Sequence, residues 1–407
     1  MKLISVGEAR TLIAGNTVSA KIEFEPIEKL SGRILGDNVY APFPTPLFDN
    51  SAMDGFALRA QDTRGATLKT PVLLKLKGVI PAGFSGKLAI GAGECAQCMT
   101  GAPIPAGADA VVPVEKTSGF DQPGPVNIFL EAKAGRHVRY QGEETKKGEL
   151  LIGKGTMISP PELGILATFG FGKIRVFRRP RVALFATGNE LVDPGKKLRR
   201  GQIFNSNFYV LADLVRRAGA QIEFKQVVKD DPDDLIKIMG AALTQCDIIV
   251  TSGGVSMGRF DFIRKDLQAL NVKEHFWRVA QKPGKPLFFG GGEKTMLFGL
   301  PGNPVSAFIS FMEYVWPVLE NLSGREPEKV FEAFLTVSFP REAQKHRFLF
   351  GKTWYEKGRW LCTPAKKTGS HMLTAALEAN CIIGVAPGPG PLARGSAVSA
   401  KLLPWMK

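Results

Sequence analysis

The chain has 407 residues and a mass of 44.1 kDa, so it is long enough for about two to four domains, and a single small module is excluded. Hydrophobic residues make up 44% and charged residues 22%, which is typical of a globular protein rather than a disordered one. The net charge of +15 favours anionic ligands. The basic residues are not interleaved with aromatic ones, as in single-strand binders, so we expect no nucleic-acid partner.

The cysteines and the apolar runs of the sequence indicate the cellular compartment in which we expect the protein to work. Five cysteines are an odd number in a long chain, which favours free thiols in a reducing environment. Cys95 and Cys98 have metal-ligand spacing but no second pair, so a structural zinc site is not expected. The chain starts without an apolar signal core and contains no apolar run of about 18 residues. We therefore expect a cytoplasmic protein that makes no contact with membranes.

The first part of the chain mixes helical and extended patterns. Apolar residues recur at helical spacing behind Ser5, a suitable N-cap, and a second helix is expected over residues 25–34. Three alternating prolines in residues 41–46 then require an extended connector. A further helix is expected from Ser159 to about Gly170. We assign residues 1–48 and 141–178 to an N-terminal mixed domain.

Residues 49–140 are expected to form a small β module inserted into that domain. Short β-like runs at residues 72–76, 95–99, 110–114 and 126–130 are separated by Gly and Pro. Two loops in this module carry candidate site residues. Asp54 ends a cluster of polar residues that begins at Asp49, and Thr100 lies in a stiff loop rich in Gly and Pro. A turn rich in Asx residues explains part of this composition without any function.

Residues 179–326 alternate strands with helices. Strands are expected at residues 182–186, 222–228, 248–250 and 295–299, with helices over 208–217 and 233–243, after Asp261 and from Val305. This rhythm predicts a doubly wound, mostly parallel α/β sheet that is covered on both faces. Ligands of such sheets bind at the carboxyl ends of the strands. Residues 327–407 return to short β-like runs, which predict a small C-terminal β-barrel or sandwich.

Four strand ends in the α/β domain carry polar or glycine-rich loops, at residues 186–191, 228–232, 251–256 and 299–306. Gly253 and Gly254 leave backbone N–H groups free for an anion, and Ser256 and Asp261 add a hydroxyl and a carboxylate. Gly302 and Asn303 precede a helix, where phosphate is favoured. Each of these features taken alone is explained by a capped helix or a solvated lysine. Because the four loops share a position at the strand ends, together they predict an anion and metal site, to which Lys282 and Lys285 add positive charge.

Taken together, six motifs resemble one family, the molybdopterin molybdenumtransferases of the MoeA type, which include the gephyrin E domain. The motifs occur in order along nearly the whole chain, at residues 49–55, 99–103, 187–190, 251–256, 282–286 and 300–306. The resemblance implies an elongated homodimer of four-domain chains, with an active site shared between the subunits. It also implies insertion of molybdate into adenylylated molybdopterin with Mg²⁺, release of AMP, and transient contact with the molybdopterin adenylyltransferase.

The resemblance assigns roles to individual residues. The carboxylates hold Mg²⁺ on the phosphoanhydride and the lysines offset the charge of the oxyanion and phosphate. The implied metal ligands are Asp54, Asp231 and Asp261. The implied catalytic residues are these three with Thr100 and Glu190. The implied substrate-binding residues are Gly253, Gly254, Ser256, Arg278, Lys282, Lys285, Pro286, Gly302 and Asn303.

The chain departs from relatives at five positions. Arg278 stands where some relatives carry Lys, and Asn189 and Glu144 each stand where some relatives carry Asp. Phe350 and Ala375 align with an Arg and a Ser thought to contact molybdate in relatives. Two alternatives are therefore a tungstate-handling paralogue and a non-catalytic scaffold that retains the fold. A third, a nucleic-acid binder, rests on net charge alone. The retained carboxylates favour an enzyme, because a scaffold has no need to concentrate them at strand ends.

Overall fold

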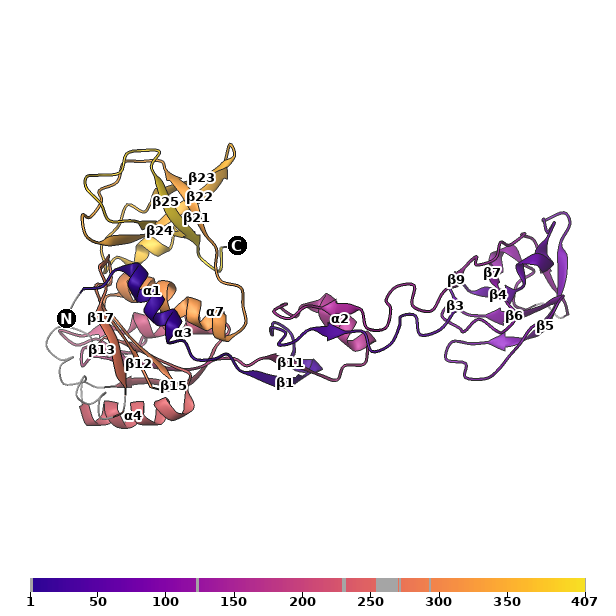
Figure 1. Ribbon diagram of the computed structural model, residues 1–407, viewed down its shortest axis with the longest axis horizontal. Helices are drawn as coiled ribbons and strands as arrows, with labels where there is room; N and C mark the ends of the chain where they lie inside the picture. The colour runs from indigo at the N-terminus through magenta and orange to yellow at the C-terminus, as the bar shows by residue number, and fades with distance from the viewer. Residues whose placement is uncertain are drawn as a thin grey trace. The chain divides into compact units, whose positions relative to one another are not determined.

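The computed structural model describes residues 3–121, 124–228, 232–253, 270, 272–292 and 294–406. The chain forms two compact units (Figure 1). The larger unit consists of Met1–Asp37, Gly155–Ser159 and Lys173–Lys407, and the smaller one of Asn38–Lys154 and Pro160–Gly172. The finer division into four domains stays a prediction.

The larger unit contains a six-stranded sheet in the order β15-β12-β16-β20-β19-β17. The first four strands are parallel, so the predicted mostly parallel sheet is confirmed, and β19 and β17 are joined to it antiparallel. These last two strands were not predicted. The bounds are β12 (Arg181–Thr187), β15 (Gln221–Val228), β16 (Ile248–Ser252), β17 (Lys273–Arg278), β19 (Pro286–Gly291) and β20 (Met296–Leu300).

Both faces of this sheet are buried. In β12, Val182 and Leu184 pack into the core that contains α3 (Ser206–Arg217), whereas Ala183 and Phe185 pack into the core that contains α4 (Pro232–Gln245). Figure 1 shows α3 and α4 on opposite sides of the strands. Continuous apolar runs are typical of parallel strands that are covered on both faces, and that prediction is confirmed. The helix expected after Asp261 lies outside the described residues.

The predicted long helix after Val305 consists of three consecutive segments, namely α6 (Pro304–Ser310), the π-helix η4 (Phe311–Val315) and α7 (Trp316–Leu322). Glu313 in η4 is only 5% exposed, yet it pairs with Arg10 and, at 2.9 Å, with Lys401. Burial alone would raise the pKa of Glu313, but these two cations hold it below its ordinary value. No helix in the described ranges is both long and apolar enough to cross a membrane.

The C-terminal strands close into a small barrel, as predicted. Strand β22 pairs with both β23 and β24, which completes the ring β22-β23-β21-β25-β24. A short strand from the α/β part, β18 (Gln281–Lys282), pairs in parallel with the start of β22. The barrel strands are β21 (Val330–Leu335), β22 (His346–Glu356), β23 (Arg359–Pro364), β24 (Cys381–Val385) and β25 (Ala397–Leu402), with a 3-10 turn η5 (Leu373–Ala376) before β24.

At the N-terminal end, one prediction is confirmed and one is wrong. Helix α1 (Val6–Gly15) begins with the expected cap, because Ser5 Oγ accepts from the Glu8 N–H and the Glu8 carboxylate accepts from the Ser5 N–H. The helix expected over residues 25–34 is absent. That segment forms β1 (Ile22–Pro26), which pairs antiparallel with β11 (Lys173–Phe177), and the 3-10 turn η1 (Ile27–Lys29). Pro26 favours an extended residue before it, and the distant β11 supplies the pairing.

The smaller unit contains a five-stranded sheet in the order β7-β4-β6-β5-β8, and the predicted β runs are confirmed. Gly55 opens β4 where a Cβ atom would lie 2.1 Å from the Val112 carbonyl, so only glycine fits there. Helix α2 (Pro160–Thr168) was also predicted. The strands are β2 (Val39–Tyr40), β3 (Asn50–Ser51), β4 (Gly55–Leu58), β5 (Val72–Ile80), β6 (Glu94–Cys98), β7 (Ala110–Pro113), β8 (Val126–Ile128), β9 (Val138–Arg139) and β10 (Leu150–Ile152).

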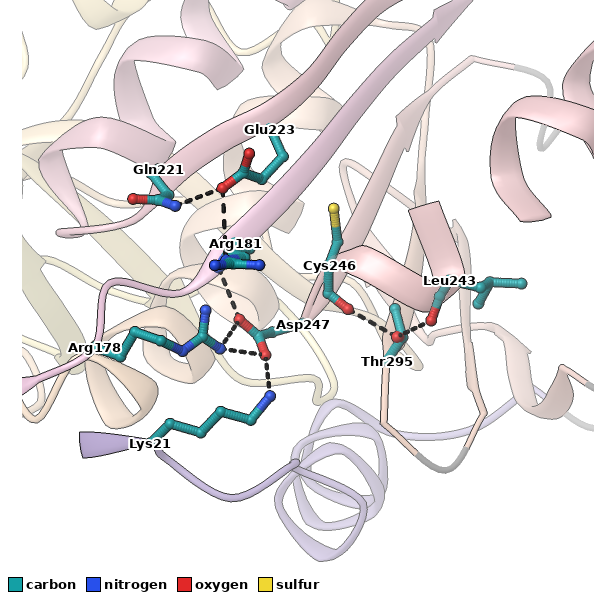
Figure 2. A network of polar contacts seen from close by, with 9 residues as sticks. All are labelled: Lys21, Arg178, Arg181, Gln221, Glu223, Leu243, Cys246, Asp247 and Thr295. Atoms are coloured by element: carbon teal, nitrogen blue, oxygen red, sulfur yellow. Dashed lines mark hydrogen bonds and ion pairs between the residues drawn. The ribbon is translucent and has the colours of Figure 1, made fainter. Parts of the chain in front are cut away.

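A buried carboxylate joins β16 to the segments on either side of the β1–β11 ribbon (Figure 2). Asp247, at the start of β16, accepts hydrogen bonds from Arg178 Nη2 at 2.6 and 2.7 Å, from the Arg181 N–H at 2.8 Å and from Lys21 Nζ at 3.1 Å. Burial alone would raise the pKa of Asp247, but these bonds hold it below the ordinary value of 3.8. Lys21 directly precedes β1 and Arg178 directly follows β11, so Asp247 fixes both strands at the end of the ribbon where Ile22 pairs with Phe177.

We expect Asp247→Asn to lower the free energy of unfolding by about 3 kcal/mol, because it leaves the cations around this site without a buried counter-charge. Because the folded-state pKa of Asp247 is lowered, its contribution is complete above 3.8 and is lost as the pH falls through the folded value. Urea denaturation at neutral pH and at about pH 3 measures both effects. Asp213→Asn, which breaks an exposed pair with Arg217, is the matched control and should change stability by less than about 0.5 kcal/mol. Equal losses in the two variants would contradict the assignment.

Candidate functional site

A cavity of about 1140 Å³ opens in the larger unit at the carboxyl ends of β12, β16 and β20. Three of the four predicted strand-end loops therefore converge, and the barrel closes one side of the cavity through Lys345 and residues 368–371. The fourth loop, at residues 228–232, lies almost wholly outside the described residues. The predicted site residues that line the cavity are Glu190, Gly253, Lys282, Lys285, Pro286, Gly302 and Asn303.

Helix α3 joins two of the strand-end loops. Asn207, in its first turn, donates from Nδ2 to Ser252 Oγ at 3.0 Å and to the Gly302 carbonyl at 2.7 Å. Asn205 is the N-cap of the same helix, and its Oδ1 accepts from the Phe208 N–H. The sequence prediction began this helix at residue 208 and missed both residues. The signal was present, because Asn205 is a preferred N-cap residue directly before an apolar helical pattern.

Two polar atoms in the cavity wall have no hydrogen-bond partner in the described part of the chain. They are Thr187 Oγ1, in a residue that is 8% exposed, and Asn205 Nδ2, in a residue that is 2% exposed. Buried polar atoms of this kind cost free energy unless something pairs with them. Both residues line the cavity, so a polar ligand is the natural partner.

The cavity is rich in cations. Lys282 forms an ion pair with Glu342 at 2.7 Å, which lowers the pKa of that carboxyl. Among the described residues, no carboxylate pairs with Lys285 or Lys345, which also line the cavity. Gly253 has a φ of +91°, and an added Cβ would lie 2.5 Å from the Thr187 carbonyl, so only glycine lets β16 end this close to β12. The cavity is therefore suited to a ligand with negative charge.

The other predicted site residues lie elsewhere. Arg278 ends β17 outside the cavity lining, with its guanidinium 4.6 Å from the centre of the Trp277 ring. Asp231, Gly254, Ser256 and Asp261 lie outside the described residues. Asp54 and Thr100 belong to the smaller unit, where the structure brings them together. Asp54 Oδ1 accepts from both the N–H and the hydroxyl of Thr100, at 2.7 and 2.9 Å.

The described carboxylates can contribute only part of a metal site. No group of three or more His, Cys, Asp or Glu side chains in the described ranges is close enough to hold a metal ion. Glu190 lines the cavity, and no described donor binds its carboxylate. Oxygen ligands suit Mg²⁺, which is commonly held by one or two carboxylates together with substrate phosphates. The described donors therefore fit a magnesium ion of that kind.

The two departures in the barrel are apolar and buried. Phe350 is 4% exposed, and its ring packs edge-on against Phe308 of α6. Ala375 is 8% exposed and belongs to the same core. The barrel instead contributes polar groups to the cavity through Lys345, Ser370 and His371. The sequence reasoning missed these, because their place in the cavity follows from the docking of the barrel on α6, where the Val305 N–H donates to the Ser370 carbonyl.

The fold and the cavity define a class of protein, a multidomain α/β and β protein with a cavity at the strand ends of a doubly wound domain. Three family models match: the MoeA N-terminal region (domain I and II) at residues 4–170, a probable molybdopterin binding domain at 183–321, and the MoeA C-terminal region (domain IV) at 332–403. The chain belongs to the MoeA family of molybdopterin molybdenumtransferases, which act in molybdenum cofactor biosynthesis.

Individual relatives agree with this assignment. The molybdopterin molybdenumtransferase of Bacillus subtilis is 32% identical over 98% of this chain and 94% of that protein. Molybdopterin molybdenumtransferase 2 of Mycobacterium tuberculosis is 37% identical over 84% of this chain and 86% of that protein. A crystal structure of a molybdopterin biosynthesis MoeA protein from Pyrococcus horikoshii superposes with a TM-score of 0.82 at 33% identity, covering 98% of this chain and 99% of that one.

The pair formed by Asp54 and Thr100 can be tested directly. The N–H and then the hydroxyl of Thr100 hold the pKa of Asp54 below its ordinary value of 3.8. Thr100→Val removes only the hydroxyl, so we expect the pKa of Asp54 to rise while the fold is kept. An NMR titration of the Asp54 side-chain carbon measures the change. Thr70→Val, at an exposed threonine of the same unit, should leave Asp54 unaffected. An unchanged Asp54 pKa in Thr100→Val would contradict the role of the hydroxyl.

Proposed function

We propose that this chain inserts molybdate into adenylylated molybdopterin in a Mg²⁺-dependent reaction that releases AMP. One observation carries the proposal, namely that the described residues of the cavity at the strand ends combine lysines without an ion pair, unpartnered buried polar atoms and the carboxylate of Glu190, which no described donor binds. A ligand with phosphate groups and a polar ring system satisfies all three features. The names of the relatives, which refer to molybdopterin and to molybdenum transfer, support the same ligand class.

The residues of the cavity have distinct tasks in this proposal. Lys285 and Lys345 offset the negative charge of the phosphates and of the oxyanion. Asn205 and Thr187 orient the ligand through their unpartnered polar atoms. Glu190 would hold a magnesium ion together with Asp231 and Asp261. When bound, the ion supplies charge stabilisation for the departing AMP phosphate.

The proposal includes a homodimer in which each active site is shared. Asp54 and Thr100 belong to one compact unit and the cavity to the other, so a second copy could supply one of the two parts. Asp54 of one subunit then acts together with Glu190 of its partner. The adenylylated substrate comes from the molybdopterin adenylyltransferase by transient contact, in the cytoplasm.

The reaction is tested by measuring AMP release from adenylylated molybdopterin with the purified protein. We expect release only when both molybdate and Mg²⁺ are present, and loss of release when EDTA removes the metal. Repeating the assay with tungstate in place of molybdate distinguishes the proposed reaction from that of a tungstate-handling paralogue. Absence of AMP release under all these conditions would overturn the proposal and favour a non-catalytic scaffold.

The shared site is tested by mixing two inactive variants, Asp54→Ala and Glu190→Ala. Random reassociation gives about half heterodimers, each with one intact site and one doubly defective site, so about a quarter of wild-type activity should return. Differently tagged subunits, captured in tandem, verify that heterodimers form. If the captured heterodimers stay inactive, each site is contained within one subunit and the shared-site model is wrong.

A further inference from the structure

The lysine loop, defined as residues 282–286, brings Lys282 and Lys285 to the wall of the cavity. Backbone hydrogen bonds hold its two ends. At the first end β18 pairs with β22 of the barrel, with Gln281 opposite His346, and at the second the Lys285 carbonyl accepts from the Val279 N–H at 3.0 Å. Gly284 lies between these ends. Whatever fixes Gly284 therefore sets the position of the two lysines.

A buried side chain binds Gly284 from beneath the loop. Gln281 is 1% exposed, and its Nε2 donates to the Gly284 carbonyl at 3.0 Å and lies 3.4 Å from Ser310 Oγ. Its Oε1 accepts from the hydroxyl of Tyr314, which is itself 1% exposed. Ser310 ends α6 and Tyr314 belongs to η4. A continuous chain of hydrogen bonds thus runs from a buried helix to the middle of the lysine loop.

The backbone of the lysine loop also packs directly against the side chains of Gln281 and Ser310. Gly284 has a φ of +88°, and an added Cβ would lie 2.6 Å from Ser310 Oγ and 2.7 Å from Gln281 Nε2. No side chain fits between the loop and the helix at this point. A change in the position of Gln281 must therefore move the backbone that carries Lys282 and Lys285.

A buried Gln–Tyr pair can serve stability alone, but two features favour a role in ligand binding. The carbonyl that Gln281 binds belongs to the cavity wall, and Gln281 itself lines the cavity. Burial, together with the nearby Glu313 charge, raises the pKa of Tyr314, so its hydroxyl stays protonated and donates at every physiological pH. The hydrogen bond that holds Gln281 is thus constant across working conditions.

We propose that Gln281 and Tyr314 are positioning residues for the lysines of the lysine loop, and through them for the phosphate groups of the ligand. The proposal rests on the proposed function only for the identity of that ligand. Lysine side chains are flexible, so the backbone decides which region their ammonium groups can reach. A misplacement of about 1 Å in such a group can cost roughly a hundredfold in rate.

The test measures the affinity for inorganic pyrophosphate by calorimetry, without turnover. Tyr314→Phe leaves Gln281 Oε1 without its donor, so we expect the dissociation constant to rise about tenfold. In a background that carries both Lys282→Ala and Lys285→Ala the same change should have little further effect, because the groups that Tyr314 positions are already gone. In an Asn207→Ala background, where the altered group lies on α3, the full effect should persist. Additive losses in the background without the two lysines would overturn the proposal.

Two further variants separate positioning from stability. Tyr355→Phe, at a residue that is 62% exposed on β22, should bind pyrophosphate like the wild type. The double variant Gln281→Met with Tyr314→Phe removes both polar side-chain groups, so it should regain thermal stability relative to Tyr314→Phe. It should not regain affinity, because nothing then holds the Gly284 carbonyl. If affinity returns together with stability, the pair is purely structural and the proposal is wrong.

The outcomes also separate this proposal from the proposed function. A wild-type protein that binds pyrophosphate but releases no AMP would refute the proposed function. The positioning role would still be decided by the pyrophosphate affinities of the single and combined variants. A wild-type protein that releases AMP, with unchanged pyrophosphate affinity in Tyr314→Phe, would refute the positioning role alone. A wild-type protein that does not bind pyrophosphate at millimolar concentration would overturn the positioning role and leave the function to be decided by the AMP-release assay.

Discussion

The buried carboxylate of Glu313 is the constraint on which the larger unit depends. It pairs with Arg10 of α1 and with Lys401 of β25, which lie 303 and 88 residues away, so two distant segments meet at one helix. A buried charge is costly unless it is paired, and removal of either cation would leave Glu313 partly uncompensated. The next residue along η4 is Tyr314, which holds the lysine loop through Gln281. Docking of the barrel and the shape of the cavity wall therefore depend on adjacent residues of the same π-helix, and π-helical turns are frequent at functional sites.

The cavity combines a general feature of doubly wound sheets with one that is particular to this chain. Parallel strands bring their carboxyl ends to one edge, and this alone places Glu190, Gly253 and Gly302 together. Asn207 then ties two of these ends to α3 through Ser252 and Gly302. The barrel adds the remaining wall, because β18 leaves the α/β part to pair with β22. The lysine loop thus follows a strand that belongs to the barrel sheet, so its position depends on both the α/β part and the barrel of the larger unit.

Much of the fold was predictable from the sequence, because local signals agreed with the final structure. The apolar runs at residues 182–186 and 248–250 have the composition of buried parallel strands, and Ser5 with Glu8 is a complete capping box. The failures have physical causes. The segment around Pro26 looks helical by itself and becomes a strand because β11, about 150 residues later, pairs with it. The contribution of Ser370 and His371 to the cavity depends on barrel docking, which no local pattern encodes. Asp54 and Thr100 lie 46 residues apart, and no local pattern in the sequence predicts that they form a hydrogen bond.

The distribution of charge in the cavity narrows what the site can bind. Glu342 forms an ion pair with Lys282, whereas Lys285 and Lys345 form no ion pair in the described part of the chain. A ligand that approaches Lys282 must compete with Glu342, but a ligand that approaches Lys285 displaces only water. Lys285 is therefore the more available of these two cations for an anion. Several lysines along one cavity wall favour a ligand that carries several negative charges along its length over a single small anion.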